Sequence, residues 1–411
     1  MLPLAALLLL PGCSGAEVVA APAPEKVEVS IHHAEGAGRA ALDRLAEIHE
    51  ARRPNADVTI HFPLGVRPLE PTSDTFQASM GHRLFRWLTP GDVQLEPVTQ
   101  GDWSIPHELL DVNTKDGVLY GVPISVIRYS TFFYNPVLLK SYGIKVDELN
   151  QPGMAGVQAL LDACATLAAD PVNPIEQPFA LGNIYEWTLD MLFWEALFPA
   201  IVGPDYYTRF WSGHADPVNE PELEDALAVL LELSQYFNAD SAEIDFPEVL
   251  DRIAEGECAF GQQGEWGADM LVAHGYSNGA EFGVMPFPGT ADIFLFSEDS
   301  FPIVAGTGNY AATQEFLNTV ATEEAQIEVN RLKGTLPALT GIDIDAHPFN
   351  DAQKASYAHF TSASYRLPAV HGFKSDDVMP DLSSIMKVMI ETQNTRELRA
   401  YVAANYALLA Q

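Results

Sequence analysis

One short segment has residue spacing that could support nucleophilic catalysis. Gly275, Ser277 and Gly279 satisfy the pattern G-x-S-x-G, which in many hydrolases places a reactive serine in a sharp turn that follows a strand and precedes a helix. Here the apolar pattern predicts a helix over 266–274 before the motif and a strand over 282–286 after it. The order of elements is reversed, so we expect no nucleophile elbow and no catalytic residue here.

Metal and nucleotide motifs are incomplete. His107-Glu108 lacks the second histidine of H-E-x-x-H, 343–345 lacks the glycine and distal glutamate of a calcium loop, and no G-x-x-x-x-G-K-[ST] run occurs. His32, His33 and Glu35 lie in a turn after the first predicted strand, but adjacent residues of an extended chain point to opposite faces. We therefore expect ligand-lining or simple loop residues there, no metal and no cofactor; an ATPase would be another chain.

Length and charge set broader limits. A chain of 411 residues with 47% hydrophobic residues is long enough for two lobes, each with its own core. The 22 basic and 56 acidic residues give a formal charge of 22 − 56 = −34, which repels nucleic acid and anionic membrane surfaces. We expect partners that are neutral or cationic, and no nucleic acid.

The first residues resemble a bacterial lipoprotein signal. Leu2–Leu10 is apolar, too short to span a bilayer, and ends in Leu10-Pro11-Gly12-Cys13. The resemblance implies cleavage before Cys13 and lipid attachment to it, so 1–25 would be a signal peptide and tether. The two other cysteines, Cys164 and Cys258, could be buried thiols or a disulfide, and their spacing does not decide between these.

The next segments predict an α/β lobe. Alternating apolar residues predict strands over 27–31 and 58–62, and helical spacing lies between them over 42–49. A strand, a helix and a strand joined by short links form a βαβ unit, which implies a parallel sheet covered by helices.

Helices dominate later. We expect a short amphipathic helix over 76–88, a buried helix over 189–198, a helix that begins near Glu222 and continues to Phe237, and another over 313–331. The middle of the chain should therefore form a helix-rich lobe.

One long apolar stretch connects these parts. Asp116–Asn135 opens with an Asp-Gly turn signal and continues as DGVLYGVPISVIRYSTFFYN, rich in β-branched and aromatic residues. Pro123 removes one ladder donor, so the strand should be bent, at an edge, or crossing between two bodies. We favour the crossing.

Six segments in this order resemble landmarks of bacterial extracellular solute-binding proteins, especially the glucose- and related sugar-binding proteins of ABC importers. They are the stretch 116–135, Gly264-Glu265-Trp266, Pro288-Gly289-Thr290, Asp299-Ser300-Phe301, Ala325-Gln326 and Lys333-Gly334-Thr335-Leu336-Pro337. The resemblance implies an α/β fold of the two-lobe clamshell type, with a hinge of crossing segments and a ligand cleft. Lobe 1 would comprise 26–135 plus about 300–345, and helix-rich lobe 2 would comprise 136–299 plus 346–411.

The resemblance also implies a function. The protein would capture a neutral carbohydrate, such as a monosaccharide, small oligosaccharide or polyol, and deliver it to membrane permease subunits from the periplasm or cell surface, as a monomer. Sugars stack an apolar face on aromatic rings and offer hydroxyls to polar side chains. The family pattern places ligand-binding residues at Gln77, Trp187, Trp266, Asp299, Lys333 and His371, and Arg128 is a further candidate.

Alternatives stay open for several of these residues. Trp187 and Trp266 could be core residues, Asp299 could cap a turn, and Lys333 could serve the end of a helix. The chain has Ser79, Ile127 and Phe246 where sugar binders of this kind usually carry His, His and Trp. A sugar other than glucose, a polyol or a modified saccharide is therefore at least as well supported as glucose, and the alternative functions are an exported saccharide-acting enzyme or a ligand-sensing subunit.

Overall fold

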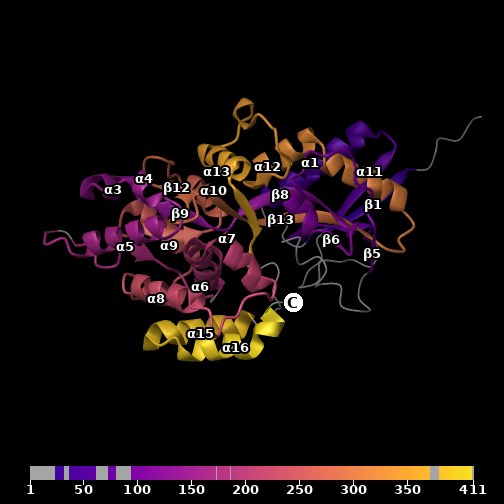
Figure 1. Ribbon diagram of the computed structural model, residues 1–411. Helices are drawn as coiled ribbons and strands as arrows, with labels where there is room; N and C mark the ends of the chain where they lie inside the picture. Colours follow the sequence, from indigo (N-terminus) through magenta and orange to yellow (C-terminus); the bar gives the residue numbers. More distant parts are fainter. Residues whose placement is uncertain are drawn as a thin grey trace, which may run out of the picture.

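The protein folds as an α/β clamshell of two lobes, described here from a computed structural model (Figure 1). The structure describes residues 24–31, 37–61, 73–79, 94–172, 174–185, 187–370 and 379–409. In these ranges no helix combines the length and apolar character needed to cross a bilayer.

The predicted βαβ unit is confirmed in lobe 1. Strand β1 (Glu25–Ser30) pairs in parallel with β2 (Ala56–His61), and helix α1 (Ala37–Arg52) connects them. Val27 and Val29 are buried because alternate β1 residues face the same core as one side of α1. Short β3 (Thr75–Phe76) pairs with β1 on its other side.

A second sheet completes lobe 1. Its long strands are β8 (Gly121–Arg128) and β13 (Ile293–Val304), which run antiparallel. The other strands in it are β4 (Ala78–Ser79), β5 (Leu95–Glu96), β14 (Leu336–Pro337) and β15 (Tyr365–Pro368). The remaining lobe 1 elements are α2 (His107–Asp111), β6 (Thr114–Lys115), β7 (Val118–Leu119), α11 (Tyr310–Val320), α12 (Glu323–Lys333) and η3 (Ile344–Ala346).

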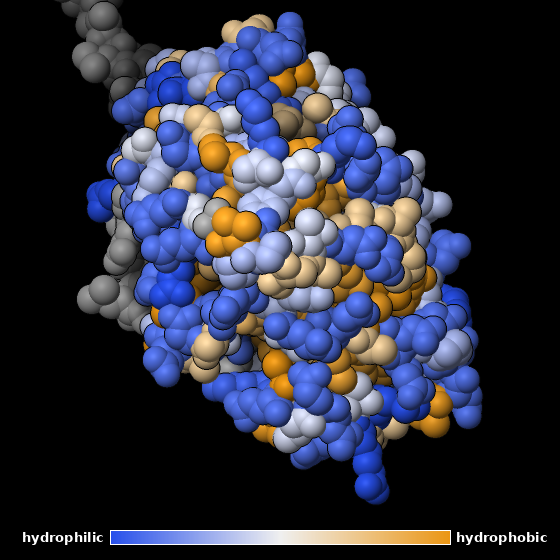
Figure 2. All heavy atoms as spheres, turned by 90° about the vertical axis from the view of Figure 1, so that its left-hand side faces the viewer, coloured by the Kyte–Doolittle hydropathy of each residue, from blue (hydrophilic) through white to orange (hydrophobic). Residues whose placement is uncertain are grey.

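Lobe 2 consists of a four-stranded sheet and the helices around it. The strands follow the order β10 (Phe179–Ala180), β11 (Phe260–Gln263), β9 (Thr131–Tyr134) and β12 (Gly283–Pro286). The helices are α3 (Pro136–Tyr142), α4 (Val146–Leu149), α5 (Met154–Ala168), α6 (Trp187–Leu192), η2 (Phe193–Leu197), α7 (Phe198–Trp211), α8 (Glu222–Ser234), α9 (Phe246–Glu255), α10 (Trp266–Ala273), α15 (Met379–Thr392) and α16 (Arg396–Leu409). Figure 2 shows this end of the molecule, where hydrophilic residues predominate with smaller apolar areas between them.

The stretch 116–135 does cross between the lobes, but it breaks later than Pro123. Pro123 lies inside β8, at a β-bulge where the register with β13 shifts, and the chain changes sheets at Tyr129-Ser130. Backbone hydrogen bonds fix this change, since Tyr129 N donates to Leu295 O (3.1 Å) and Phe287 N donates to Ser130 O (2.9 Å). The break falls here because, within the described residues, β9 pairs only with the lobe 2 strands β11 and β12.

The chain returns to the lobe 1 sheet in β13, which begins at Ile293, and α13 (Asp351–Ser362) spans both lobes. In α13, Tyr357 and Phe360 lie in the lobe 1 core, whereas Ala352 lies in a lobe 2 cluster. Helix α13 therefore contributes side chains to the cores of both lobes.

Several helix predictions are confirmed and two are corrected. The buried helix over 189–198 exists as α6, the π-helical η2 and the start of α7, and α10 lies where expected. Helix α8 begins at Glu222 as expected and ends at Ser234, before Phe237. The helix expected over 76–88 is wrong at its start, because 75–76 and 78–79 pair as strands; 80–93 lies outside the described residues. The helix expected over 313–331 is two helices, because Thr322 caps α12 by accepting from Ala325 N.

Candidate ligand site between the lobes

An aromatic cluster lies where the chain passes between the lobes. Trp266, the first residue of α10, packs edge-to-face on Tyr129 of the crossing, with ring centroids 5.5 Å apart. Trp187, the first residue of α6, belongs to the same cluster with Ile127, Met191 and Ala369. The two predicted stacking residues are thus brought together from different helices, and both are partly buried.

Asp299 and Lys333 form an ion pair in lobe 1. Lys333 Nζ donates to Asp299 Oδ2, and the side chains are 20% and 2% exposed, respectively. Asp299 lies where the register between β13 and β8 shifts, and Lys333 is the last residue of α12, which Gly334 ends at φ = 80°. Two predicted site residues therefore contact each other. The alternative that Lys333 lies at the end of a helix is also correct.

Four residues of β8 and β13 form one face of their sheet, which we call the interlobe surface: Ser125, Ile127, Ser297 and Asp299. In the antiparallel register Ser125 lies opposite Asp299 and Ile127 lies opposite Ser297. Alternate residues share a face, and those of the other face, including Ile124, Val126 and Phe296, pack in the lobe 1 core. Ile293 and Leu295, which precede Ser297 at the same spacing, pack in the lobe 2 core. The interlobe surface therefore faces lobe 2.

Gln77 also lies next to this region. It is a buried residue between β3 and β4, and Ser79 of β4 pairs with Asp299. Two other predicted positions, His371 and Cys13, lie outside the described residues. Their roles stay predictions.

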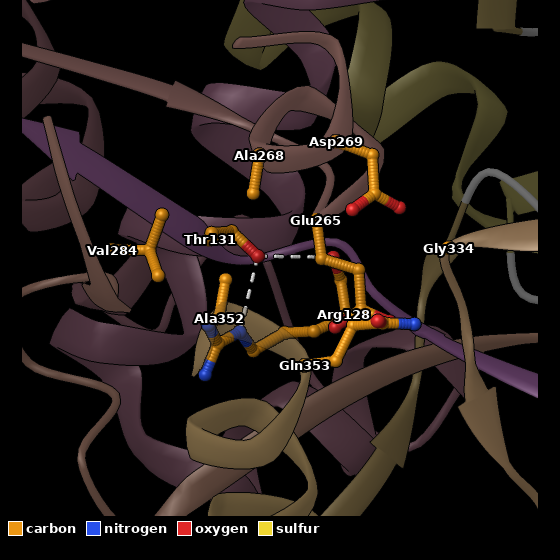
Figure 3. Close-up of a pocket in the computed structure, with 9 residues that line it drawn as sticks. All are labelled: Arg128, Thr131, Glu265, Ala268, Asp269, Val284, Gly334, Ala352 and Gln353. Carbon is orange, nitrogen blue, oxygen red and sulfur yellow. Dashed lines mark hydrogen bonds between the residues drawn. The ribbon is translucent and has the colours of Figure 1, made fainter. Parts of the chain in front are cut away.

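Arg128, the remaining predicted residue, lies in a separate buried polar cluster at the crossing (Figure 3). Its Nε donates to Thr131 Oγ1 (3.1 Å), and its Nη1 lies 3.3 Å from His359 Nδ1 of α13. A cavity of about 10 Å³ adjoins it, enough for about one water molecule. The residues that line this cavity are Arg128, Thr131, Glu265, Ala268, Asp269, Val284, Gly334, Ala352 and Gln353.

Charges in this crossing cluster are balanced. Burial raises the pKa of Glu265 to about 7, an effect that Arg128 and a 2.6 Å hydrogen bond from Ser356 Oγ oppose. Burial lowers the pKa of Arg128 to about 10, which Glu265 opposes, and burial followed by Arg128 lowers the pKa of His359 to about 3. Arg128 therefore carries its positive charge beside a neutral His359, and the carboxylate of Glu265 offsets that charge.

Sequence reasoning missed Tyr129, Glu265 and His359 as members of these clusters. Glu265 was visible, because it lies in the Gly264-Glu265-Trp266 segment, and Tyr129 lies within the crossing stretch. His359 gave no local signal, since α13 meets Arg128 only in the folded chain. In the described ranges no three His, Cys, Asp or Glu side chains gather in a way that could hold a metal ion.

Comparisons with known proteins agree with this architecture. An uncharacterised ABC transporter extracellular-binding protein of Pyrococcus horikoshii is 25% identical, with 94% of this chain and 90% of that protein covered. The xylose/arabinose-binding protein XacG of Haloferax volcanii is 29% identical over 64% of this chain, and the match spans 55% of XacG.

Solved structures show the same fold at low sequence identity. The bacterial solute receptor AcbH, described as preferring β-D-galactopyranose, superposes with a TM-score of 0.74 at 16% identity, with 94% of this chain and 100% of AcbH covered. RafE in complex with raffinose gives a TM-score of 0.71 at 14% identity, covering 94% of this chain and 100% of RafE. The model of the bacterial extracellular solute-binding proteins matches residues 74–327, more than half of the chain. The chain therefore belongs to the family of bacterial extracellular solute-binding proteins.

Proposed function

We propose that this protein captures a neutral carbohydrate between its lobes and delivers it to the permease subunits of an ABC importer. Trp187 and Trp266 would stack on the sugar ring, and Asp299, Lys333 and Gln77 would bind its hydroxyls. Arg128 and His371 remain further candidates. Closure of the lobes around the ligand would select the form presented to the permease.

One observation carries this proposal: the aromatic cluster and the polar residues meet on one surface. Ile127 packs with Trp187 and Trp266, and two residues earlier on the same face Ser125 lies opposite Asp299. An apolar aromatic wall beside hydrogen-bonding groups matches a sugar, which has an apolar face and a polar rim.

The charge balance favours a neutral ligand. Lys333 is already paired with Asp299, and Arg128 lies beside Glu265 in the crossing cavity. A ligand with a carboxylate would need a basic side chain that is not already paired with an acidic one, and both of these basic side chains have acidic neighbours. The sugars named for XacG, AcbH and RafE, which are neutral, support the same choice.

The first residues of the sequence support a proposed location. Leu10-Pro11-Gly12-Cys13 resembles a lipoprotein signal and supports lipid attachment to Cys13, which would place the protein in the periplasm or on the cell surface. We also propose that it acts as a monomer. Mass spectrometry of the membrane-extracted protein should find the lipid on Cys13, and no lipid on the Cys13→Ala variant.

Thermal unfolding with candidate ligands tests the main proposal. A ligand that binds only the folded state raises the melting temperature, so D-glucose, D-galactose, D-xylose, L-arabinose and raffinose should include at least one stabiliser, confirmed by titration calorimetry. D-glucuronate and D-galacturonate should have no effect. Preferential stabilisation by the acidic sugars, or conversion of a sugar to products, would contradict the proposal.

A further inference from the structure

Two buried hydroxyls of the interlobe surface have no partner. Ser125 and Ser297 are both 0% exposed, and neither Oγ makes a hydrogen bond within the protein. A buried polar group without a partner costs about 1–3 kcal/mol, so such groups are uncommon in folded proteins. Some nearby buried hydroxyls do have partners, since Ser356 donates to Glu265 (2.6 Å) and Thr131 accepts from Arg128 (3.1 Å). Ser130 and Ser300 also lack a partner among the described residues, but neither belongs to the interlobe surface.

The two orphan hydroxyls are neighbours of the predicted ligand contacts. Ser125 lies directly opposite Asp299, and Ser297 lies directly opposite Ile127 and two residues before Asp299. Residues paired in this way have Cβ atoms about 4.5–5.5 Å apart on one face of the sheet. Both hydroxyls therefore lie between the Asp299–Lys333 pair and the aromatic cluster that includes Ile127.

Their orientation is toward the second lobe. Ile293 and Leu295, at the same alternation as Ser297, pack in the lobe 2 core, whereas Ile124 and Val126 on either side of Ser125 pack in the lobe 1 core. Side chains on this face are covered when the lobes are together and accessible when they separate, as in any clamshell that admits a ligand.

We infer that Ser125 and Ser297 are ligand-binding residues that each form a hydrogen bond with a hydroxyl of the bound carbohydrate. This inference rests on the proposed function and extends it to two residues that set specificity. A serine hydroxyl both donates and accepts, as a sugar hydroxyl does, so the pair suits an uncharged polyhydroxyl ligand. Because the interlobe surface offers Ile127 beside Ser297, the sugar carbon nearest Ile127 should present its apolar side.

Alanine variants and deoxy sugars test this together. Calorimetry would measure the affinity of the wild type, Ser125→Ala and Ser297→Ala for D-glucose, D-galactose, D-xylose and L-arabinose, and then for the monodeoxy forms of the sugar that binds best. Each variant should bind about three- to tenfold more weakly. The wild type should bind one monodeoxy sugar more weakly than the parent sugar by the same factor. The matching alanine variant should bind that deoxy sugar and the parent sugar with equal affinity.

Two controls separate ligand contact from a structural role. The ligand-free variants should melt at or above the wild-type temperature, since an unpaired hydroxyl has been removed; a clearly lower value would show an internal partner and overturn the inference. Ser130→Ala removes an equally buried and unpartnered hydroxyl outside the interlobe surface, and should leave affinity unchanged. An equal loss in that variant would also overturn it.

The results distinguish this inference from the proposed function. Unchanged affinity in both Ser→Ala variants, with tight sugar binding by the wild type, would overturn the inference and leave the proposed function standing. Absence of binding by the wild type to all four sugars and to raffinose would overturn both.

Discussion

The carboxylate of Asp269 lies directly against the backbone of Gly334. A side chain at Gly334 would overlap Asp269 Oδ2, while Asn350 Nδ2 donates to Asp269 Oδ1 at 2.6 Å. Asp269 is three residues after Trp266 in α10, and Gly334 follows Lys333. This contact therefore joins the helix that carries the aromatic wall to the segment that carries the ion pair.

Gly334→Ala should destabilise the protein more than Gly341→Ala. Both glycines have positive φ, +80° and +86°, so either alanine carries backbone strain of about 1 kcal/mol, but only at Gly334 does a Cβ meet another group. Displacing Asp269 from Asn350 should add about 1 kcal/mol to the loss of unfolding free energy. Denaturant unfolding of the two variants measures the difference, and equal losses would show that the Asp269 contact contributes nothing.

Trp266→Ala should weaken carbohydrate binding at least tenfold and leave the protein folded. Removing the ring deletes a stacking surface and its edge-to-face contact with Tyr129, while Trp266 is only partly buried, so most of the core is unaffected. Calorimetry with the best-binding neutral sugar measures the affinity. Trp266→Phe is the matched control and should recover part of it; an affinity that survives in the alanine variant would remove Trp266 from the site.

Asp299→Asn should lower both affinity and stability. The substitution keeps the shape but leaves the largely buried Lys333 without its carboxylate, at about 1–3 kcal/mol of unfolding free energy. Sugar affinity should fall about tenfold or more, because a charged acceptor is lost. Asp345→Asn is the comparison: its ion pair with Lys354 is exposed, with Asp345 81% exposed, and both properties should stay as in the wild type. A similar small effect in both variants would place the Asp299–Lys333 pair outside the ligand site.

Glu298→Gln should remove part of the pH dependence of stability. Glu298 is buried on the core side of β13 beside Asn113, and burial raises its pKa to about 8. Because this pKa lies above the unfolded value of about 4.3, the wild-type contribution is complete below about pH 4 and is lost as the pH rises through about 8.

The glutamine variant keeps the neutral form at all pH values. It should match the wild type near pH 4 and exceed it by on the order of a few kcal/mol in unfolding free energy at pH 9. Denaturant unfolding at both pH values tests this, and taking the difference between the two proteins cancels other titrating groups such as Glu265. A constant difference from pH 4 to pH 9 would show that Glu298 does not titrate in this range.

Local patterns in the sequence identified much of the fold. Two predictions used only residues close together in the sequence, and the structure agrees with both. They are the strand that contains Val27 and Val29, and the helix-then-strand order around Ser277. The crossing at 116–135 was identified, but the position of its break was not, because Pro123 is accommodated at a bulge that only the β13 partner creates. The helix expected from Phe76 failed for a related reason, since pairing with β1 and β13 overrides helical spacing.

The sequence by itself determined the residue types available to a ligand: two tryptophans, an Asp, a Lys and a Gln in recognisable segments. Only the tertiary structure decided that Lys333 pairs with Asp299, that Arg128 lies in a crossing cluster with His359, and that Ser125 and Ser297 share a face with Asp299. These relationships join residues far apart in the chain, and they depend on strand register and on a single bulge. Register describes how two strands pair, so it cannot be predicted from the sequence of one segment alone.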